Sequence, residues 1–226
     1  MAGLFITFEG PDGSGKTTQA ALLVEKLKHL GYSVLFTREP GGTDLGRVLR
    51  KLLLEPGSQL AAMTEVLLMA ADRAQHVEEV IKPALQNNMI VICDRYVDSS
   101  LAYQGFALLG DVRSVKMINE AATGGLWPDL TLLLDVDVEV GLKRHLPVMS
   151  SRDNAVLDRI EQRDLAFHEK VRQGYQELQK IYPRRFAVVD TTFLKIEDIS
   201  EKIWRNVQQR LRTLDMEPHA LKRRGK

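Results

Sequence analysis

The sequence has almost no cysteine, almost no net charge and no long hydrophobic run. Cys93 is the only cysteine among 226 residues, which excludes an internal disulfide and favours a reduced, cytoplasmic compartment. The 31 basic and 30 acidic residues leave a net charge of +1, so no overall field attracts nucleic acid. The apolar stretches are strand-sized, and the N-terminus shows no charged-then-apolar signal segment. We therefore expect an enzyme-sized cytoplasmic domain with neither a nucleic-acid nor a membrane partner.

A glycine-rich segment near the N-terminus is the most informative part of the sequence. Residues 10–17 read GPDGSGKT and fill every position of the phosphate-binding loop pattern G-x-x-x-x-G-K-[ST]. A chance glycine-rich turn is the alternative, but the apolar strand pattern at 4–8 and the helical leucine spacing at 19–30 supply the flanking elements that the loop requires. Its glycines leave backbone N–H groups free to face a β-phosphate in front of a helix.

This loop predicts a nucleoside triphosphate site. Lys16 is expected to reach the β- and γ-phosphates, and the hydroxyl of Thr17 to ligate Mg²⁺. The residues expected to hold the triphosphate are Gly10, Pro11, Asp12, Gly13, Ser14, Gly15, Lys16, Thr17 and Thr18.

A carboxylate is needed beside the metal, and two strand patterns end in one. The stretch 90–94 ends in Asp94 and the stretch 130–135 ends in Asp135, so either could lie opposite the loop. Asp94 is favoured because Arg95 follows it, which would place an acid for the metal next to a guanidinium for a second phosphate.

Strand and helix patterns alternate along the chain. Strand patterns occupy 4–8, 34–37, 90–94, 130–135 and 186–189, and helical patterns occupy 19–30, 43–54, 64–87, 112–122, 138–144, 167–182 and 196–214. This alternation predicts an α/β fold in which helices cover both faces of a five-stranded parallel sheet, as one domain over 1–214.

Two segments stand outside that pattern. Residues 146–154 form a polar interruption that contains proline and serine, and we expect a lid over about 145–158. Residues 215–226 form a basic tail; a nucleic-acid role is conceivable, but a disordered terminus is favoured because the rest of the chain is neutral.

Missing motifs narrow the class of phosphate-loop protein. A GTPase should show a D-x-x-G switch and an N-K-x-D box, and a transport ATPase should show an L-S-G-G-Q-like signature; neither set is in place. Arginines are present instead near predicted strand ends and around the lid: Arg38, Arg50, Arg73, Arg95, Arg144, Arg152 and Arg159. Such a supply of positive charge suits phosphoryl transfer between two anionic nucleotides.

Several motifs in combination resemble the thymidylate kinase family in its bacterial form. They are Phe8-Glu9-Gly10, Thr37-Arg38-Glu39-Pro40-Gly41-Gly42-Thr43, Ala70-Ala71-Asp72-Arg73-Ala74-Gln75, Asp94-Arg95-Tyr96, Ser99-Ser100-Leu101-Ala102-Tyr103-Gln104-Gly105 and Pro128-Asp129-Leu130-Thr131. The resemblance implies the nucleoside monophosphate kinase fold, transfer of phosphate from ATP to dTMP with Mg²⁺, and a homodimer. It also implies that catalytic arginines come from the lid, here Arg152 and Arg159, and that Arg144 is an adenine-stacking candidate as much as a surface residue.

The same resemblance assigns the acceptor pocket. Arg95 would hold the dTMP phosphate, Arg73 would face thymine O4, and Ser100 and Gln104 would reach the polar edge of the base. Tyr103 would crowd the sugar C2′, although ordinary helix packing is an even alternative. Asp12 would touch the 3′-hydroxyl and order the arginines of the site. Residues expected to line the pocket are Arg38, Arg50 and Glu39, the last in a cis peptide with Pro40.

One position departs from the family pattern. Met69 stands where a phenylalanine usually stacks on thymine, and its thioether offers no aromatic plane. The helix at 64–87 is the implied dimer contact, since its apolar residues exceed what one buried face needs: Val66, Leu67, Met69, Ala70, Ala74 and Val77.

Two other functions remain open on the sequence. The chain could be another nucleotide or nucleoside kinase of the same fold, or a phosphate-loop ATPase or nucleotide-binding regulator whose output is conformational. An ATPase would hydrolyse ATP without an acceptor, whereas a kinase should be nearly silent until its acceptor closes the lid.

Overall fold

A computed structural model describes residues 3–150, 157–216 and 218, and its centre is a parallel β-sheet. The sheet has five strands in the order β2-β3-β1-β4-β5. They are β1 (Leu4–Glu9), β2 (Val34–Arg38), β3 (Ile90–Asp94), β4 (Leu130–Asp135) and β5 (Phe186–Asp190). The predicted five-stranded parallel sheet is therefore confirmed.

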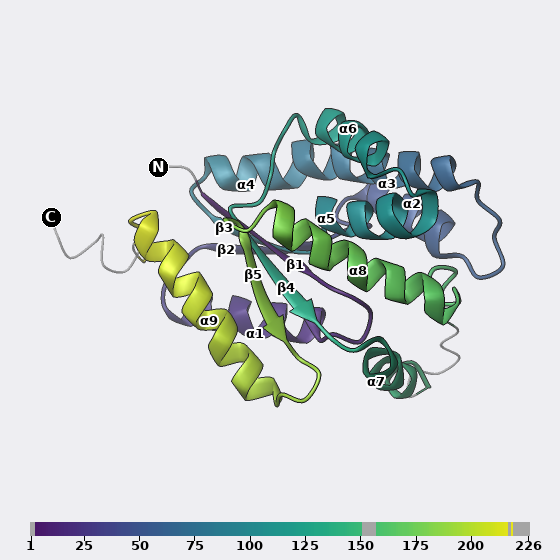
Figure 1. Ribbon diagram of the computed structural model, residues 1–226. Helices are drawn as coiled ribbons and strands as arrows, with labels where there is room; N and C mark the ends of the chain where they lie inside the picture. Colours follow the sequence, from purple (N-terminus) through teal and green to yellow (C-terminus); the bar gives the residue numbers. More distant parts are fainter. Residues whose placement is uncertain (1–2, 151–156, 217, 219–226) are drawn as a thin grey trace, which may run out of the picture.

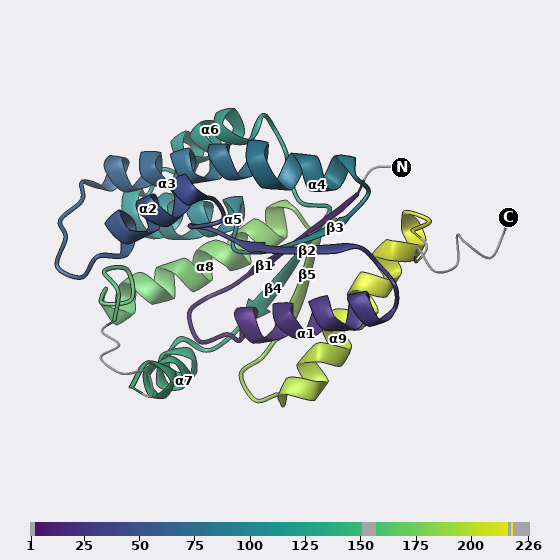
Figure 2. The same ribbon diagram turned by 180° about the vertical axis from the view of Figure 1, so that it is seen from behind.

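Helices cover both faces of this sheet (Figure 1). One face carries α1 (Lys16–His29) and α9 (Ile196–Thr213). The other carries α2 (Asp44–Leu54), α3 (Ala62–His76), α4 (Lys82–Gln86), α5 (Val97–Ser100), α6 (Val112–Thr123) and α8 (Leu165–Ile181), together with the π-helical segments η1 (Val77–Ile81) and η2 (Leu101–Leu109). The reverse view in Figure 2 shows the same two layers from behind, with α7 (Val138–Ser150) beyond the tip of β4.

Strand β1 shows why both faces are apolar. Successive side chains of a strand point to opposite faces. Phe5 packs in the core under α8 and η2, whereas Ile6 and Phe8 pack in the core under α1 and α9. Because both cores are closed by helices, β1 is buried along its whole length.

The strand register brings the polar residues of the site to one edge. Asp94 of β3 lies opposite Phe8 of β1 on one side and Arg38 of β2 on the other. Glu9 and the phosphate loop directly follow Phe8, so they lie at the same edge of the sheet as Asp94 and Arg38. Ligands of open α/β sheets bind at this carboxyl edge of the strands.

The helix boundaries correct several sequence predictions. Residues 101–109 are helical although no helix was expected there, because η2 packs against both α6 and α8 and is apolar on most sides. The helix expected over 64–87 is three consecutive segments, α3, η1 and α4. Helix α7 continues to Ser150, past the predicted end at 144 and into the expected polar interruption.

Parts of two predicted segments lie outside the described residues. They are 151–156 of the expected lid, and 217 and 219–226 of the expected tail. Across the part of the chain that the structure describes, no helix combines the length and apolar character needed to cross a membrane.

Candidate functional site

A cavity of about 1080 Å³ lies at the carboxyl edge of the sheet. It extends from the first turn of α9, across the phosphate loop, to residues of α3 and η2. The sequence-predicted residues that line it are Asp12, Gly13, Ser14, Gly15, Lys16, Thr17, Thr18, Arg38, Glu39, Arg50, Met69, Arg73, Asp94, Arg95, Ser100, Tyr103, Gln104 and Arg144. Residues from distant parts of the chain thus share one cavity, large enough for more than one ligand.

The phosphate loop has the backbone that its glycines allow. Gly10, Gly13 and Gly15 have φ values of 141°, 73° and 92°, which L side chains rarely adopt. The Nζ atom of Lys16 donates to the carbonyl of Pro11 at 2.7 Å and lies 3.4 Å from Ser14 Oγ. Burial, together with the nearby charge of Arg95, lowers the pKa of Lys16 to about 8. The two oxygens that accept from Lys16 are therefore neutral, and charged phosphate oxygens would be stronger acceptors for its ammonium group.

Thr17 and Asp94 form the oxygen pair expected for a metal. Thr17 Oγ1 donates to Asp94 Oδ2 at 2.6 Å. Asp135, the alternative carboxylate, accepts from Arg172 Nε at 2.8 Å instead. A hydroxyl and a carboxylate beside a phosphate site are the ligands that Mg²⁺ prefers, so the residues present fit this ion.

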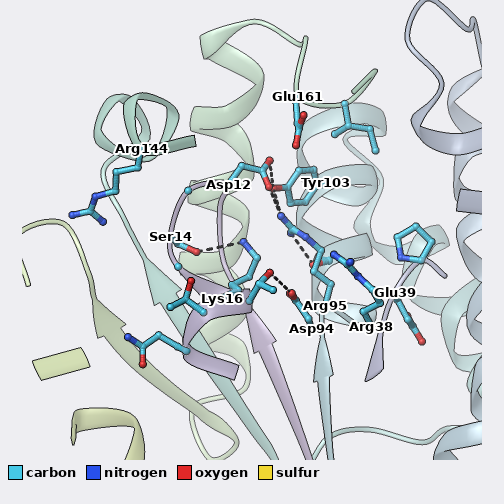
Figure 3. Close-up of a pocket in the computed structure, with 18 of the residues that line it drawn as sticks. Asp12, Ser14, Lys16, Arg38, Glu39, Asp94, Arg95, Tyr103, Arg144 and Glu161 are labelled. Atoms are coloured by element: carbon cyan, nitrogen blue, oxygen red, sulfur yellow. Dashed lines mark hydrogen bonds and ion pairs between the residues drawn. The ribbon is translucent and has the colours of Figure 1, made fainter. Parts of the chain in front are cut away.

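Arg95 is the centre of the site (Figure 3). Its backbone has φ 71°, unusual for a residue with a side chain. Its guanidinium forms an ion pair with Asp12 and donates to Tyr103 OH at 3.2 Å. Tyr103 OH in turn donates to Asp12 Oδ2 at 2.9 Å. Burial opposes ionisation of Asp12, but Arg95 and Lys16 lower its pKa to about 2, so the carboxylate stays charged.

The far end of the cavity is built around Arg73. This side chain is 2 % exposed; its Nε donates to Glu39 Oε2 at 2.7 Å and its Nη1 to Ser100 Oγ at 2.9 Å. Asn119 also accepts from Arg73. Gln104 Nε2 donates to Glu65 Oε1 at 2.8 Å. These bonds fix the orientation of side chains that the sequence predicted to contact a base.

A histidine that the sequence did not single out supports this end. His76 is fully buried, with Nδ1 2.8 Å from Glu39 Oε1 and Nε2 2.6 Å from Thr37 Oγ1. Glu39 thus lies between His76 and Arg73. The Glu39–Pro40 peptide is cis, as predicted, and Arg50 Nη1 donates to the carbonyl of Pro40 at 2.9 Å. No local pattern signals His76, because its partners are 37 and 39 residues away.

Arg144 lies at the opposite end, apart from Arg38 and Arg95 in Figure 3. Its guanidinium donates to the carbonyls of Thr191 and Thr192 at 3.0 and 2.6 Å. Residues 194–197, which end the loop after β5 and begin α9, line the cavity on this side and were not expected from the sequence.

Of the two arginines predicted to come from the lid, the structure describes Arg159. Arg159 Nε donates to the carbonyl of Leu53 at 3.0 Å and Nη2 to Glu65 Oε2 at 2.8 Å, so its guanidinium is directed to α2 and α3 instead of the phosphate loop. Arg152 lies outside the described residues. Asp158 and Glu161, near Arg159 in sequence, do line the cavity and were not predicted to do so.

Comparison with known proteins decides the family. The thymidylate kinase family model matches residues 8–203. A thymidylate kinase of Thermomicrobium roseum is 50 % identical over 205 residues, which cover 91 % of this chain and 94 % of the relative. The chain belongs to the thymidylate kinase family.

Other members of the thymidylate kinase family extend this result. The thymidylate kinase of Halothermothrix orenii is 49 % identical over 208 residues, covering 92 % of this chain and 98 % of the relative. The crystal structure of thymidylate kinase from Ehrlichia chaffeensis superposes with a TM-score of 0.75 at 34 % identity, covering 92 % of this chain and all of that one. Family and fold predicted from the motifs, including the bacterial type, are therefore confirmed.

Proposed function

We propose that this protein transfers the γ-phosphoryl group of ATP to dTMP, with ATP at the phosphate loop and dTMP at the Arg73 end of the cavity. Family membership gives the reaction, phosphorylation of dTMP to dTDP. The observation that supports this placement is that Arg95 lies in one cavity with both Lys16 and Arg73. An acceptor phosphate bound by Arg95 would face a donor phosphate bound by Lys16.

Mg²⁺ would be held by Thr17 and Asp94, whose side-chain oxygens are already in contact. When bound, this ion neutralises charge on the β- and γ-phosphates.

The residues of the chain supply positioning and charge. Lys16 leaves Pro11 and Ser14 to contact the β- and γ-phosphates. Arg95 holds the acceptor oxygen in line, and Asp12 keeps its guanidinium oriented through their ion pair. No strong base is needed, because dTMP is largely a dianion near neutral pH. Arg152 and Arg159 would cover the transferring group, which for Arg159 requires leaving Glu65.

The acceptor's base and sugar are read by the residues at the far end. Arg73, Ser100 and Gln104 face the polar edge of thymine, and Met69 contacts its ring. Tyr103 crowds C2′, which favours a deoxyribose, and Asp12 reaches the 3′-hydroxyl. Arg38, Arg50 and Glu39 complete the pocket, Glu39 by holding Arg73 in place. At the other end, Arg144 would stack on adenine.

A homodimer through α2 and α3 completes the proposal. Of the apolar residues predicted for this contact, Val66, Ala70 and Val77 are buried within the subunit, and only Leu67 is exposed. Exposed neighbours on the same two helices extend the patch: Leu45, Val48, Leu52 and Met63. An apolar patch of this kind is typical of a subunit contact. Light scattering at micromolar concentration should give twice the monomer mass of 25.5 kDa; a monomeric mass would refute the dimer.

A coupled assay of ADP release tests the function. The acceptors tested are dTMP, dUMP, dCMP, dGMP, dAMP and thymidine. Each is assayed with Mg²⁺ and ATP under reducing conditions, because we propose that the enzyme is cytoplasmic. Turnover should be highest with dTMP and nearly absent without an acceptor. Preference for another monophosphate would indicate a different nucleotide kinase, and acceptor-independent ADP release would indicate an ATPase.

A further inference from the structure

Glu9, the last residue of β1, is a fully buried carboxyl group next to the catalytic centre. The sequence placed it in a family motif but gave it no role. Its Oε1 accepts from the backbone N–H of Tyr96 at 2.8 Å. Its Oε2 lies 2.5 Å from Ser99 Oγ and 3.1 Å from Tyr175 OH. These partners are neutral, and no cation of the described residues forms an ion pair with Glu9.

The three oxygens around Oε2 form a closed triangle. Ser99 Oγ and Tyr175 OH are themselves 2.8 Å apart, so each oxygen is within hydrogen-bond distance of the other two. Three hydrogen bonds need three protons, whereas two hydroxyls and a carboxylate supply only two. A protonated Glu9 supplies the third, and then each group can donate to one neighbour and accept from the other.

Arg95 is attached to the same triangle. Its Nη1 lies 3.2 Å from Ser99 Oγ and 3.4 Å from Tyr175 OH. The proposed phosphate-binding guanidinium is therefore positioned by two hydroxyls whose orientation depends on Glu9. Tyr175 comes from α8 and Ser99 from α5, so Glu9 joins β1, α5 and α8 at one point.

Burial and one neighbouring carboxylate favour the neutral form of Glu9. Burial and the neighbouring Asp98 of α5 raise the pKa of Glu9 to about 7, although Arg95 opposes this shift. Asp98 is held in place by Arg185, which donates to both of its oxygens at 2.5 and 2.7 Å. The other titratable groups that face Glu9 are Lys16 of α1, Cys93 of β3 and Tyr175 of α8. Lys16 and Arg95 both point to the cavity, where phosphates would take up their charge.

We propose that Glu9 positions Arg95 through Ser99 and Tyr175, and that it takes up a proton when a phosphate monoester binds at Arg95. The inference rests on the proposed role of Arg95. A phosphate dianion at Arg95 adds negative charge a few atoms from Glu9, and this further disfavours the carboxylate. The proton comes from the buffer and completes the hydrogen-bonded triangle while the substrate is bound.

Titration calorimetry with dTMP alone measures this proton. Binding is followed at pH 7.5 in two buffers of different ionisation enthalpy, for wild type, Glu9→Gln and the exposed control Glu177→Gln on α8. The glutamine is neutral at every pH and mimics the protonated acid. Wild type and the control should take up about 0.5 to 0.8 proton more than Glu9→Gln, as a pKa rising from about 7 by one unit or more requires at pH 7.5.

Affinity should follow the same linkage. Binding favours protonated Glu9, so the dTMP Kd of wild type should rise relative to that of Glu9→Gln as pH rises from 6 to 9. The ratio reaches about tenfold for each unit by which binding raises the pKa. Equal proton uptake and a constant Kd ratio would overturn the inference. If Glu9→Gln does not fold, infrared difference spectra of wild type replace it: dTMP should add the carbonyl band of a neutral carboxyl, and its absence would be equally decisive.

A further variant separates this inference from the proposed function. Arg95→Ala should abolish dTMP binding detectable at millimolar concentration. If Arg95→Ala binds dTMP as wild type does, the acceptor site itself is misplaced. If dTMP requires Arg95 but proton uptake is unchanged by Glu9→Gln, only the role of Glu9 fails.

Discussion

Gly13 of the phosphate loop and Gly141 of α7 meet backbone to backbone. A Cβ on Gly13 would lie 1.9 Å from the carbonyl oxygen of Gly141, and a Cβ on Gly141 would lie 2.5 Å from the carbonyl oxygen of Asp12. Neither position has room for a side chain. The loop that we propose holds the donor phosphates therefore packs against α7, the helix that leads into the expected lid segment.

Gly141→Ala should disturb the loop more than the helix. Alanine favours a helix, but its methyl group would have to push the Asp12–Gly13 backbone away from α7. We expect ATP KM to rise and kcat to fall by roughly tenfold together, with a stability loss of about 1–3 kcal/mol. Steady-state kinetics and thermal melts measure both. Lys143→Ala, at an exposed position of the same helix, is the control. Equal kinetics for the two variants would show that the contact between Gly13 and Gly141 does not affect ATP binding or turnover.

Lys16→Ala should remove most of the activity while leaving the fold intact. Losing one preorganised charge contact with the β- and γ-phosphates costs roughly 10²-fold or more in phosphotransfer. Lys28→Ala, exposed near the end of the same helix α1, should be indistinguishable from wild type. Circular dichroism establishes folding and the ADP-release assay gives the rate. Near-normal turnover by a folded Lys16→Ala protein would show that Lys16 does not have the proposed role in phosphate binding.

ATP affinity should depend on the charge of Lys16. Its pKa is lowered to about 8, mainly by burial and then by Arg95, so the free enzyme loses this proton as pH rises through 8. ATP binds the protonated form, and its Kd should be flat below pH 7 and about tenfold higher at pH 9. Binding of ATP without acceptor is measured by calorimetry. Lys16→Ala should bind weakly at every pH; the same alkaline rise in that variant would assign the effect to another group.

The role of Arg159 can be separated from simple packing. If Arg159 covers the transferring phosphoryl group, Arg159→Ala should depress kcat more than it raises the dTMP KM. The matched variant is Arg163→Ala, since Arg163 Nη2 also contacts Glu65 Oε2, at 2.6 Å. This variant removes the same kind of contact with Glu65 at a residue for which no contact with the phosphoryl group is proposed. Equal kinetics and equal melting temperatures for the two variants would make Arg159 a residue that holds Glu65, and through it Gln104.

Met69→Phe tests where thymine lies. Met69 lines the cavity and also packs against the core, so both of its possible roles have structural support. A phenylalanine facing the base adds an offset ring contact of about 1 kcal/mol, which is several-fold in dTMP affinity, with ATP affinity unchanged. A phenylalanine forced into the core instead costs roughly 1–3 kcal/mol of stability. Calorimetry and a thermal melt, with Met117→Phe as an exposed control on α6, distinguish the two. Unchanged dTMP affinity with a lowered melting point would show that Met69 does not contact the base, and the assignment of the acceptor pocket would have to change.

The sequence alone determined the features that depend on local order along the chain. The phosphate loop could be read at 10–17 because its glycines, Lys16 and Thr17 act through their spacing within one strand–loop–helix unit. The three central strands, β1, β3 and β4, were visible because buried strands are continuous apolar runs, and the shorter apolar runs of β2 and β5 marked the two half-exposed edge strands. The family followed from short motifs whose residues reach the same edge of the sheet. By contrast, η2 was missed because a helix packed on most sides has no amphipathic period.

Only the tertiary structure decided how these residues are held. The choice between Asp94 and Asp135 rests on which carboxylate Thr17 contacts, across 77 residues of chain. Glu9 meets Tyr175 across 166 residues, His76 supports Glu39, and Gly141 receives the phosphate loop; none of these has a local signal. The physical reason is that hydrogen bonds and close backbone contacts depend on three-dimensional distance, while sequence patterns report only the period and order of side chains along one element.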